Sequence, residues 1–265
     1  MTAAERLRHK RLFLLDMDGT LYLGNQLLPG AAALLAAVRR RGGDYRYLTN
    51  NSSKGVETYI EKLRGMGLDA EAGEFYTSVD AAIAYFRGRP PYREIYTVGT
   101  RSLLGQLRAA GLPVTETLTD AADCLLLGYD TELDYHKLED ACRLLGRGVD
   151  YIATNPDWVC PTEWGYVPDC GSMAWMLEKA AGRQPRFLGK PRPDMVLSAM
   201  AQAGASPAET LVVGDRLYTD IAAGVNAGVD TLLVLSGESR ESDIGEVKPS
   251  FVFKDVSALA DILCG

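Results

Sequence analysis

The chain has 265 residues, of which 47% are hydrophobic and 24% are charged, and its formal net charge is −7. This length and composition predict one large or two smaller globular domains with a sizeable core. The acidic balance argues against nucleic-acid binding, and no apolar run reaches the roughly 20 residues that a membrane-spanning helix needs. The five cysteines form no C-x-x-C pair and the N-terminal residues lack an apolar signal segment, so we expect a cytoplasmic protein.

Residues 12–15 are four consecutive apolar residues and predict a short buried strand. Two carboxylates, Asp16 and Asp18, follow directly, and Gly19 permits a sharp turn after them. Buried carboxylates need a cation or hydrogen bonds to offset the cost of their charge. The pair would suit a divalent cation, with one acid attacking and the other transferring protons. A simple acidic turn after a strand would give the same string, so the rest of the chain must decide.

Helices and strands alternate along the next part of the chain. The apolar spacing predicts helices at 30–41, 54–66 and 80–87, and strands at 44–48 and 75–78. A Gly/Pro cluster at 88–91 suits the start of an inserted module. Within that module we expect strands at 95–98, 124–127 and 151–153, and helices at 102–110, 135–145 and 173–181.

The last part of the chain returns to the alternation of strands and helices seen in the first part. Residues 187–189 predict a strand that leads into Lys190, and residues 210–213 predict one that leads into Gly214 and Asp215. Further elements are expected as helices at 193–202, 217–227 and 257–263, and strands at 231–235 and 251–253. We therefore expect a core built from residues 1–78 and 186–265, with an inserted α/β domain at 79–185.

Four predicted strands end in polar residues of types that are useful at a phosphate or metal site: Asp16, Thr49, Lys190 and Asp215. Strands that alternate with helices predict a parallel sheet, and ligands bind at the carboxyl ends of such strands. We expect these four side chains to gather there. Each has a simpler explanation when taken alone: a helix cap for Thr49, a surface lysine for Lys190 and a loop residue for Asp215.

Together, the motifs resemble those of the haloacid dehalogenase (HAD) superfamily of phosphatases, and more narrowly its class IIA branch of nitrophenyl phosphatase-like and nucleotide phosphatase-like enzymes. They are Asp16-Met17-Asp18-Gly19-Thr20, Thr49-Asn50-Asn51, Asn155-Pro156-Asp157, Lys190-Pro191, and the run from Gly214 to Asp220. The resemblance covers nearly the whole chain. It implies a HAD-like Rossmannoid α/β core, with a parallel sheet and helices on both faces, and an inserted α/β cap domain that selects the substrate.

The resemblance further implies Mg²⁺-dependent hydrolysis of a small phosphate monoester: a sugar phosphate, nucleotide, cofactor phosphate or aryl phosphate. Asp16 would be the nucleophile that forms an aspartyl-phosphate, and Asp18 would be the general acid and base. Mg²⁺ would be held by the Asp16 carboxylate, the Asp18 backbone carbonyl and Asp215, with Asp220 behind them or in contact through water. Thr49 and the Asn50 backbone would bind phosphoryl oxygens, and Lys190 would offset negative charge.

Candidate substrate contacts are Asn50, Asn51, Asn155, Asp157, Trp158 and Trp164. The last four lie in an expected recognition loop at 155–169, which also contains Glu163. Its aromatic rings could be buried against the cap or presented to a ligand. We expect the partner to be a small phosphorylated metabolite, and the protein to be a monomer or homodimer.

Other interpretations remain at this point. A phosphotransferase or mutase, a dehalogenase, or a phosphonatase would use the same core, and a non-catalytic phosphate-binding module would also present aspartates at strand ends. Asp18 argues against a dehalogenase, and no lysine stands out that would indicate a phosphonatase. Lys190 together with a large insertion argues against the non-catalytic module. A nucleotide-cofactor domain is not favoured, because no G-x-G-x-x-G follows a strand and no G-x-x-x-x-G-K-[ST] occurs.

Overall fold

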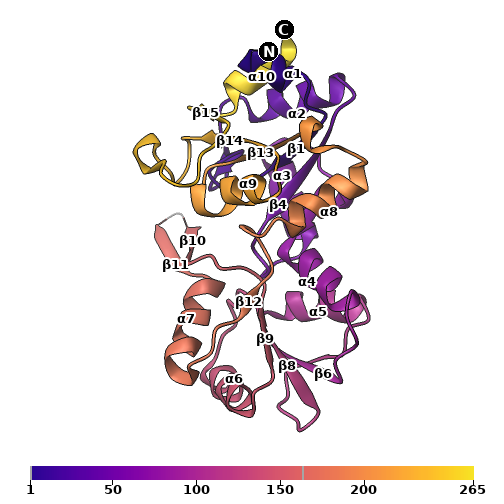
Figure 1. Ribbon diagram of the computed structural model, residues 1–265, viewed down its shortest axis with the longest axis vertical. Coiled ribbons are helices and arrows are strands. Elements are labelled where there is room, and N and C mark those ends of the chain that lie inside the picture. The colour runs from indigo at the N-terminus through magenta and orange to yellow at the C-terminus, as the bar shows by residue number, and fades with distance from the viewer. Residues whose placement is uncertain (1, 163) are drawn as a thin grey trace. The chain divides into compact units, whose positions relative to one another are not determined.

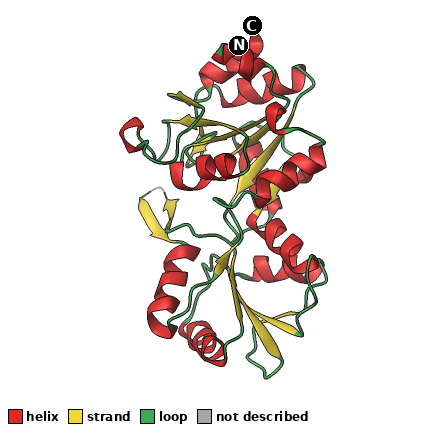
Figure 2. Ribbon diagram, viewed as in Figure 1, coloured by secondary structure: helices red, strands yellow, loops and turns green. Residues whose placement is uncertain are grey.

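The structure, a computed structural model, describes residues 2–162 and 164–265. Helices and strands alternate along both ends of the chain and along its middle (Figures 1 and 2). The chain divides into two compact units. The core unit comprises residues 1–49, 59–76 and 190–265, and the inserted unit comprises residues 50–58 and 77–189. Among the described residues, no helix is long and apolar enough to cross a membrane.

The core unit contains a six-stranded sheet with the strand order β15-β14-β13-β1-β4-β5. The strand β1 (Leu12–Leu15) is fully buried and pairs in parallel with β13 (Thr210–Gly214) and β4 (Asp44–Thr49). The outer strands are β14 (Asp230–Val234), β15 (Phe251–Phe253) and β5 (Phe75–Thr77). The carboxyl ends of β1, β4 and β13 therefore lie at one edge, as the sequence predicts.

Helices cover both faces of this sheet (Figure 1), which confirms the predicted fold class. They are α1 (Ala3–Arg8), α2 (Ala31–Arg40), α3 (Val56–Gly65), α8 (Asp194–Ala203), α9 (Ala222–Asn226) and α10 (Ser257–Cys264). In α2 the apolar face is buried, as at Leu34 and Val38. The sequence missed α1 and the short hairpin of β2 (Tyr22–Leu23) and β3 (Gln26–Leu27), because both are too short for a clear periodicity.

The predicted helix at 217–227 is wrong in its first half. A π-helical turn occupies Leu217–Ile221, and α9 follows it. The backbone N–H groups of Asp220 and Ile221 both donate to the Arg216 carbonyl, each at 3.1 Å. The widened turn brings Asp220 close to the end of β13, where a Cβ on Gly214 would lie only 2.2 Å from the Asp220 Cβ. A π turn of this kind is frequent at functional sites.

The inserted unit has its own parallel sheet, with the strand order β12-β9-β8-β6-β7. Alternate residues of β8 (Ala122–Leu127) face two different apolar clusters. One cluster includes residues of α6 (Tyr135–Arg147) and α7 (Cys170–Ala181), and the other includes residues of α4 (Ser78–Arg87) and α5 (Arg101–Ala109). The remaining strands are β6 (Glu94–Val98), β7 (Val114–Thr115), β9 (Asp150–Ala153) and β12 (Arg186–Phe187).

Three sequence expectations near the boundary differ from the structure. The strand expected at 187–189 is instead β12, which pairs with β9 in the inserted sheet and not with the core. The expected recognition loop at 155–169 contains a hairpin of β10 (Val159–Thr162) and β11 (Gly165–Pro168). Residues 50–58, expected in the core, belong to the inserted unit, because contacts such as the 2.9 Å hydrogen bond from Tyr129 N to Ser52 Oγ attach them there.

We expect Gly30→Ala to destabilise the protein more than Gly42→Ala. Both glycines have a positive φ, +83° and +69°, so alanine is strained at each. A Cβ at Gly30 would lie 2.3 Å from the Ser257 Cα, whereas a Cβ at Gly42 would meet nothing within 4 Å. Urea unfolding should show a loss of about 1 kcal/mol for Gly42→Ala and about 2 kcal/mol more for Gly30→Ala. Equal losses would contradict the close packing of α10 against the start of α2.

Candidate active site

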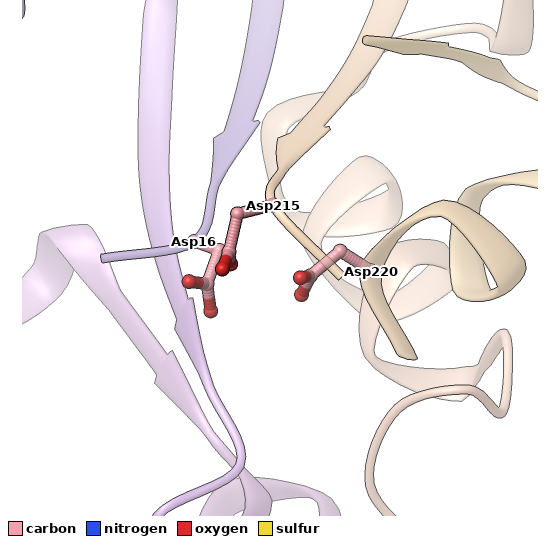
Figure 3. A group of neighbouring side chains, drawn as sticks. All are labelled: Asp16, Asp215 and Asp220. Carbon is pink, nitrogen blue, oxygen red and sulfur yellow. The ribbon is translucent and has the colours of Figure 1, made fainter. Parts of the chain in front are cut away.

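Three carboxylates converge at the carboxyl edge of the core sheet (Figure 3). Asp16 follows β1, Asp215 follows β13, and Asp220 lies in the π-helical turn. The Asp16 backbone N–H donates to the Val213 carbonyl at 2.9 Å, which continues the pairing of the two strands. One carboxylate oxygen from each residue lies within 4.8 Å of the other two. The structure thus brings together Asp16 and Asp215, as expected, and places Asp220 with them.

Lys190 lies among these carboxylates and is almost completely buried. Its Nζ donates to Asp16 Oδ1 at 2.7 Å, to Asp220 Oδ1 at 2.5 Å and to the Leu48 carbonyl at 3.1 Å. All three donor positions of the ammonium group are therefore used. One positive charge faces three carboxyl groups, so the fully ionised cluster would carry an excess of negative charge.

This excess alters the protonation of the cluster. Burial, and then the charge of Asp220, raises the pKa of Asp16 well above its usual range, although Lys190 opposes the change. Burial and Asp220 also raise the pKa of Asp215 to about 7. Burial alone would lower the pKa of Lys190, but Asp16 and Asp220 outweigh it and raise that pKa, so the lysine stays charged. Without a further cation, the cluster therefore retains protons near neutral pH.

The surroundings of Asp215 fit a hard divalent cation. Its Oδ2 accepts the Glu238 backbone N–H at 2.7 Å, whereas its Oδ1 is buried and has no hydrogen-bond partner among the described residues. A Cβ at Gly237 would lie 2.0 Å from Asp215 Oδ2 and a Cβ at Gly19 2.5 Å from it, so only glycine permits this approach. A buried carboxylate oxygen without a partner is costly unless something binds it, and carboxylate oxygens are ligands that Mg²⁺ and Ca²⁺ prefer.

Asp18 lies outside the group of three carboxylates, and its side chain is 45% exposed. Its Oδ2 accepts the Tyr22 hydroxyl at 3.2 Å, and its Oδ1 lies 3.6 Å from the Lys62 Nζ. Burial and the charge of Asp18 raise the pKa of Tyr22 well above its usual range, so the phenol stays protonated and can donate. Sequence reasoning identified Asp18 but missed both of its partners.

Thr49 is buried at the end of β4, and the two asparagines after it make hydrogen bonds within the inserted unit. The Asn50 amide donates to Asp157 Oδ1 at 3.1 Å, and the Asn50 carbonyl accepts from the Asn155 amide at 2.8 Å. Asn51 Oδ1 accepts from Ser53 N at 2.9 Å and from Ser53 Oγ at 2.7 Å. These bonds fix the segment after β4, while the expected role of these residues in substrate binding stays a prediction.

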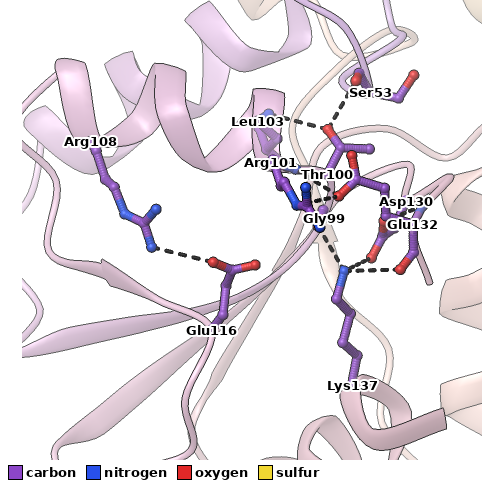
Figure 4. A network of polar contacts seen from close by, with 10 residues as sticks. All are labelled: Ser53, Gly99, Thr100, Arg101, Leu103, Arg108, Glu116, Asp130, Glu132 and Lys137. Atoms are coloured by element: carbon purple, nitrogen blue, oxygen red, sulfur yellow. Dashed lines mark hydrogen bonds and ion pairs between the residues drawn. The ribbon is translucent and has the colours of Figure 1, made fainter. Parts of the chain in front are cut away.

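A polar network anchors the same segment to the inserted sheet (Figure 4). Thr100 Oγ1 donates to the Ser53 carbonyl at 2.9 Å and also accepts the Leu103 N–H at the start of α5. Lys137 donates to the Gly99 carbonyl at 3.1 Å and to Asp130 Oδ2 at 2.8 Å. The loops that follow β6 and β8 are thereby joined, and residues 50–58 are held against them.

The tryptophans expected in the recognition loop lie on or beside the β10–β11 hairpin and are not buried against the unit. Trp158 is 52% exposed and Trp164 is 78% exposed. Trp158 lines a cavity of about 720 Å³ within the inserted unit, together with Tyr129 and Trp175. Glu163 lies outside the described residues.

Sequence reasoning also missed the loop after β14. The Ser239 backbone N–H donates to the Asp215 carbonyl at 3.1 Å, and Ser236 Oγ donates to the Gly19 carbonyl at 2.7 Å. With the Glu238 N–H, this loop fixes both the backbone and the carboxylate of Asp215. The sequence did contain a signal for this loop. Small or polar residues, from Ser236 to Ser239, follow the strand predicted at 231–235, and the carboxyl end of that strand lies at the same edge of the sheet as Asp16 and Asp215.

Two family models match the chain. One, described as haloacid dehalogenase-like hydrolase, covers residues 13–113, and the other, described as HAD-hydrolase-like, covers residues 187–259. The chain is 34% identical to an acid sugar phosphatase from Staphylococcus epidermidis, over 97% of this chain and 99% of the relative.

Solved structures agree with these matches. A 4-nitrophenylphosphatase from Thermotoga maritima is 39% identical with a TM-score of 0.91, and the match covers 97% of this chain and 98% of that one. A glycerol phosphate phosphatase from Mycobacterium tuberculosis, solved in complex with magnesium, is 31% identical with a TM-score of 0.89. That match covers 96% of this chain and 78% of that one.

Lys190→Met should lower the free energy of unfolding of the metal-free protein by about 3 kcal/mol at pH 8, because the buried carboxylates lose their cation. The loss should be smaller at pH 5, since the pKa of Asp215 is raised to about 7 and that of Asp16 is also raised, so less negative charge is left without a cation there. Urea unfolding with a chelator at the two pH values measures both effects. Adding Asp220→Asn to Lys190→Met should restore part of the stability. A loss that does not depend on pH would contradict the electrostatic explanation.

Proposed function

The chain belongs to the haloacid dehalogenase-like hydrolases, and we propose that it is a Mg²⁺-dependent phosphatase that hydrolyses a small phosphate monoester. The observation that carries the proposal is the placement of Asp16, which Lys190 contacts at 2.7 Å beside Asp215 at the carboxyl edge of the parallel sheet. The names of the relatives, which include sugar, glycerol and nitrophenyl phosphatases, support this class of substrate.

In the first step, an Asp16 carboxylate oxygen attacks the phosphorus atom and the bond from phosphorus to the leaving oxygen breaks. Asp18 gives its proton to that oxygen, so the product leaves as an alcohol or phenol. Thr49, at the end of β4, donates to a phosphoryl oxygen. Lys190 offsets the negative charge that gathers on Asp16 and on the phosphoryl group.

In the second step, water attacks the phosphorus atom of the aspartyl-phosphate. Asp18, now ionised, takes a proton from that water, and the bond from phosphorus to Asp16 breaks to release inorganic phosphate. The same carboxyl group thus acts as acid and then as base, and the enzyme returns to its starting protonation state.

The carboxylates of Asp16 and Asp215, with the Asp18 backbone carbonyl, would hold Mg²⁺. When bound, Mg²⁺ supplies positive charge that polarises the phosphoryl group. Asp220 fits a position behind these ligands, because Lys190 occupies its Oδ1 at 2.5 Å and the Arg216 N–H occupies its Oδ2 at 3.1 Å. Its charge keeps Lys190 in place and fully ionised.

The inserted unit would act as the cap that selects the substrate. We expect its exposed Trp158 and Trp164 to contact an aryl or nucleoside group of the substrate. Asn50, Asn51, Asn155 and Asp157 stay candidate substrate contacts. A cytoplasmic location, a monomeric or homodimeric state and the lack of nucleic-acid partners stay predictions from the sequence.

The proposal predicts Mg²⁺-dependent phosphate release from at least one compound in a panel of sugar phosphates, nucleotides, pyridoxal phosphate and 4-nitrophenyl phosphate. Asp16→Asn should lower the rate by at least about 10³-fold, because it removes the nucleophile. Asp69→Asn, which changes an exposed carboxylate outside the cluster, is the matched control and should keep the wild-type rate. Release that survives Asp16→Asn would contradict the proposed nucleophile. No release from any compound, together with no thermal shift by beryllium fluoride and Mg²⁺, would contradict the function.

Mg²⁺ should raise the melting temperature more at pH 8 than at pH 5.5. In the metal-free protein the pKa of Asp215 is raised to about 7, and that of Asp16 is also raised. At these two groups the folded state therefore binds more protons than the unfolded state above about pH 4, and the stability that they contribute falls as the pH rises toward 7. Above about pH 7 the Asp215 carboxyl group is mostly ionised in the folded protein, so Mg²⁺ no longer competes with protons for it.

A Mg²⁺ concentration 100-fold above Kd should stabilise the protein by about 2.7 kcal/mol at pH 8, or roughly 5–10 °C. Thermal denaturation with and without Mg²⁺ measures the shift. Asp215→Asn should abolish it, and equal shifts at the two pH values would show that protons do not compete for the site.

A further inference from the structure

We propose that Tyr22 and Lys62 are positioning residues that hold the two oxygens of the Asp18 carboxyl group in place for proton transfer to the leaving group. The inference rests on the proposed function, since Asp18 needs a fixed position only if it transfers a proton. It concerns residues that the motifs of the sequence do not single out.

Each oxygen of the Asp18 carboxyl group has a different partner. The Tyr22 hydroxyl donates to Asp18 Oδ2 at 3.2 Å, and the Lys62 Nζ lies 3.6 Å from Asp18 Oδ1. A carboxylate with a single partner can rotate about its χ angles while keeping that contact, whereas two partners on different oxygens define the plane of the group. The Asp18 side chain is 45% exposed, so packing alone does not restrain it.

The two partners also support each other. The Lys62 Nζ lies 4.0 Å from the centroid of the Tyr22 ring, which is the geometry of a cation–π contact. Tyr22 is fully buried, so its ring is a fixed platform for the lysine. The Lys62 side chain is 29% exposed and would otherwise be free to extend into solvent. The ring therefore orders the lysine, and both groups order Asp18.

The backbone keeps Tyr22 at a fixed distance from Asp18. The N–H groups of Thr20, Leu21 and Tyr22 converge on the Met17 carbonyl, and Gly19 N–H donates to the Tyr22 carbonyl at 2.8 Å. Gly19 has a φ of +82°, which closes this turn. Lys62 comes from α3, a separate element, so the site of Asp18 is built from two parts of the core unit.

Fixed orientation matters because a proton is transferred only over a short distance and a narrow angle. General acid catalysis contributes roughly 10²–10⁴-fold, and a misplaced acid loses much of this. The benefit depends on the leaving group. An alkoxide must be protonated as it departs, whereas a nitrophenolate is stable without a proton. A defect in the positioning of Asp18 should therefore slow the hydrolysis of alkyl phosphates and have little effect on the hydrolysis of nitrophenyl phosphate.

The experiment compares kcat/KM for the best alkyl phosphate of the panel and for 4-nitrophenyl phosphate in Tyr22→Phe, Lys62→Met and the double variant. This constant covers the steps up to departure of the leaving group, so the later role of Asp18 as a base does not enter. We expect each single variant to lose about 10-fold with the alkyl phosphate and less than about 3-fold with the nitrophenyl phosphate. The double variant should lose more than either single variant with the alkyl phosphate.

Two matched variants separate positioning from general damage. Lys62→Arg keeps a cation over the ring and should recover most of the alkyl phosphatase activity. Arg64→Met removes an exposed cation from the same helix and should leave both substrates unaffected. Equal losses with both substrates would indicate a structural role and overturn the proposal. A rise in kcat would do so as well, because it would mean that the contacts hold Asp18 away from its working position.

A crystal structure of the double variant gives a readout that does not depend on activity. The Asp18 side chain should move or become disordered while Asp16, Lys190 and Asp215 stay in place. An unchanged Asp18 would overturn the positioning role even if the protein hydrolyses phosphate esters. If the proposed phosphatase function is wrong but the positioning role is right, the result differs. The wild-type protein then hydrolyses no phosphate ester, and Asp18 is still displaced in the double variant.

Discussion

The site depends on one buried ammonium group among three carboxylates. Lys190 binds Asp16 and Asp220 directly, and it arrives from a different part of the chain from either of them. Burying these charges costs several kcal/mol for each ion, and a well-packed apolar cluster is often as stable. Asp215 Oδ1 has no hydrogen-bond partner in the described part of the chain, which adds to the cost. The arrangement is therefore explained by what it can bind and not by what it contributes to folding.

Close backbone packing makes this concentration of charge possible. Gly19 and Gly237 lie against the Asp215 carboxylate, and Gly214 lies against Asp220, at distances that a Cβ could not tolerate. The π-helical turn Leu217–Ile221 brings Asp220 toward β13. Because strands β1 and β13 are hydrogen-bonded neighbours, Asp16 and Asp215 need no flexible loop to meet. The carboxylates are thus held by rigid elements, as electrostatic stabilisation of a reaction requires.

The sequence predicted this edge of the sheet well, because short apolar runs followed by Asp16, Thr49 and Asp215 are a local signal. The prediction of Lys190 rests on a partly wrong reason. The strand before it, β12, was expected in the core sheet but pairs with β9 in the inserted unit. Which strands pair cannot be inferred from a local stretch of sequence. The hairpin of β10 and β11 is not evident from the sequence, because its strands are mostly half-exposed and contain prolines at Pro161 and Pro168. The partners of Asp18 are not evident from the sequence, because Lys62 lies in α3, whose sequence shows only an ordinary helical pattern.

Asp16 and Asp18 are separated by one residue, yet their environments differ in a way that suits different tasks. In a continuous strand they would point to the same face of the sheet, but the chain leaves β1 after Leu15 and turns around the Met17 carbonyl. Asp16 faces Lys190 inside the cluster, whereas Asp18 is 45% exposed and faces Tyr22. A nucleophile benefits from a dry site with a fixed cation beside it. An acid that must release and regain a proton in every turnover needs contact with the leaving group and with water, so the turn gives the two carboxyl groups environments that suit the roles we propose for them.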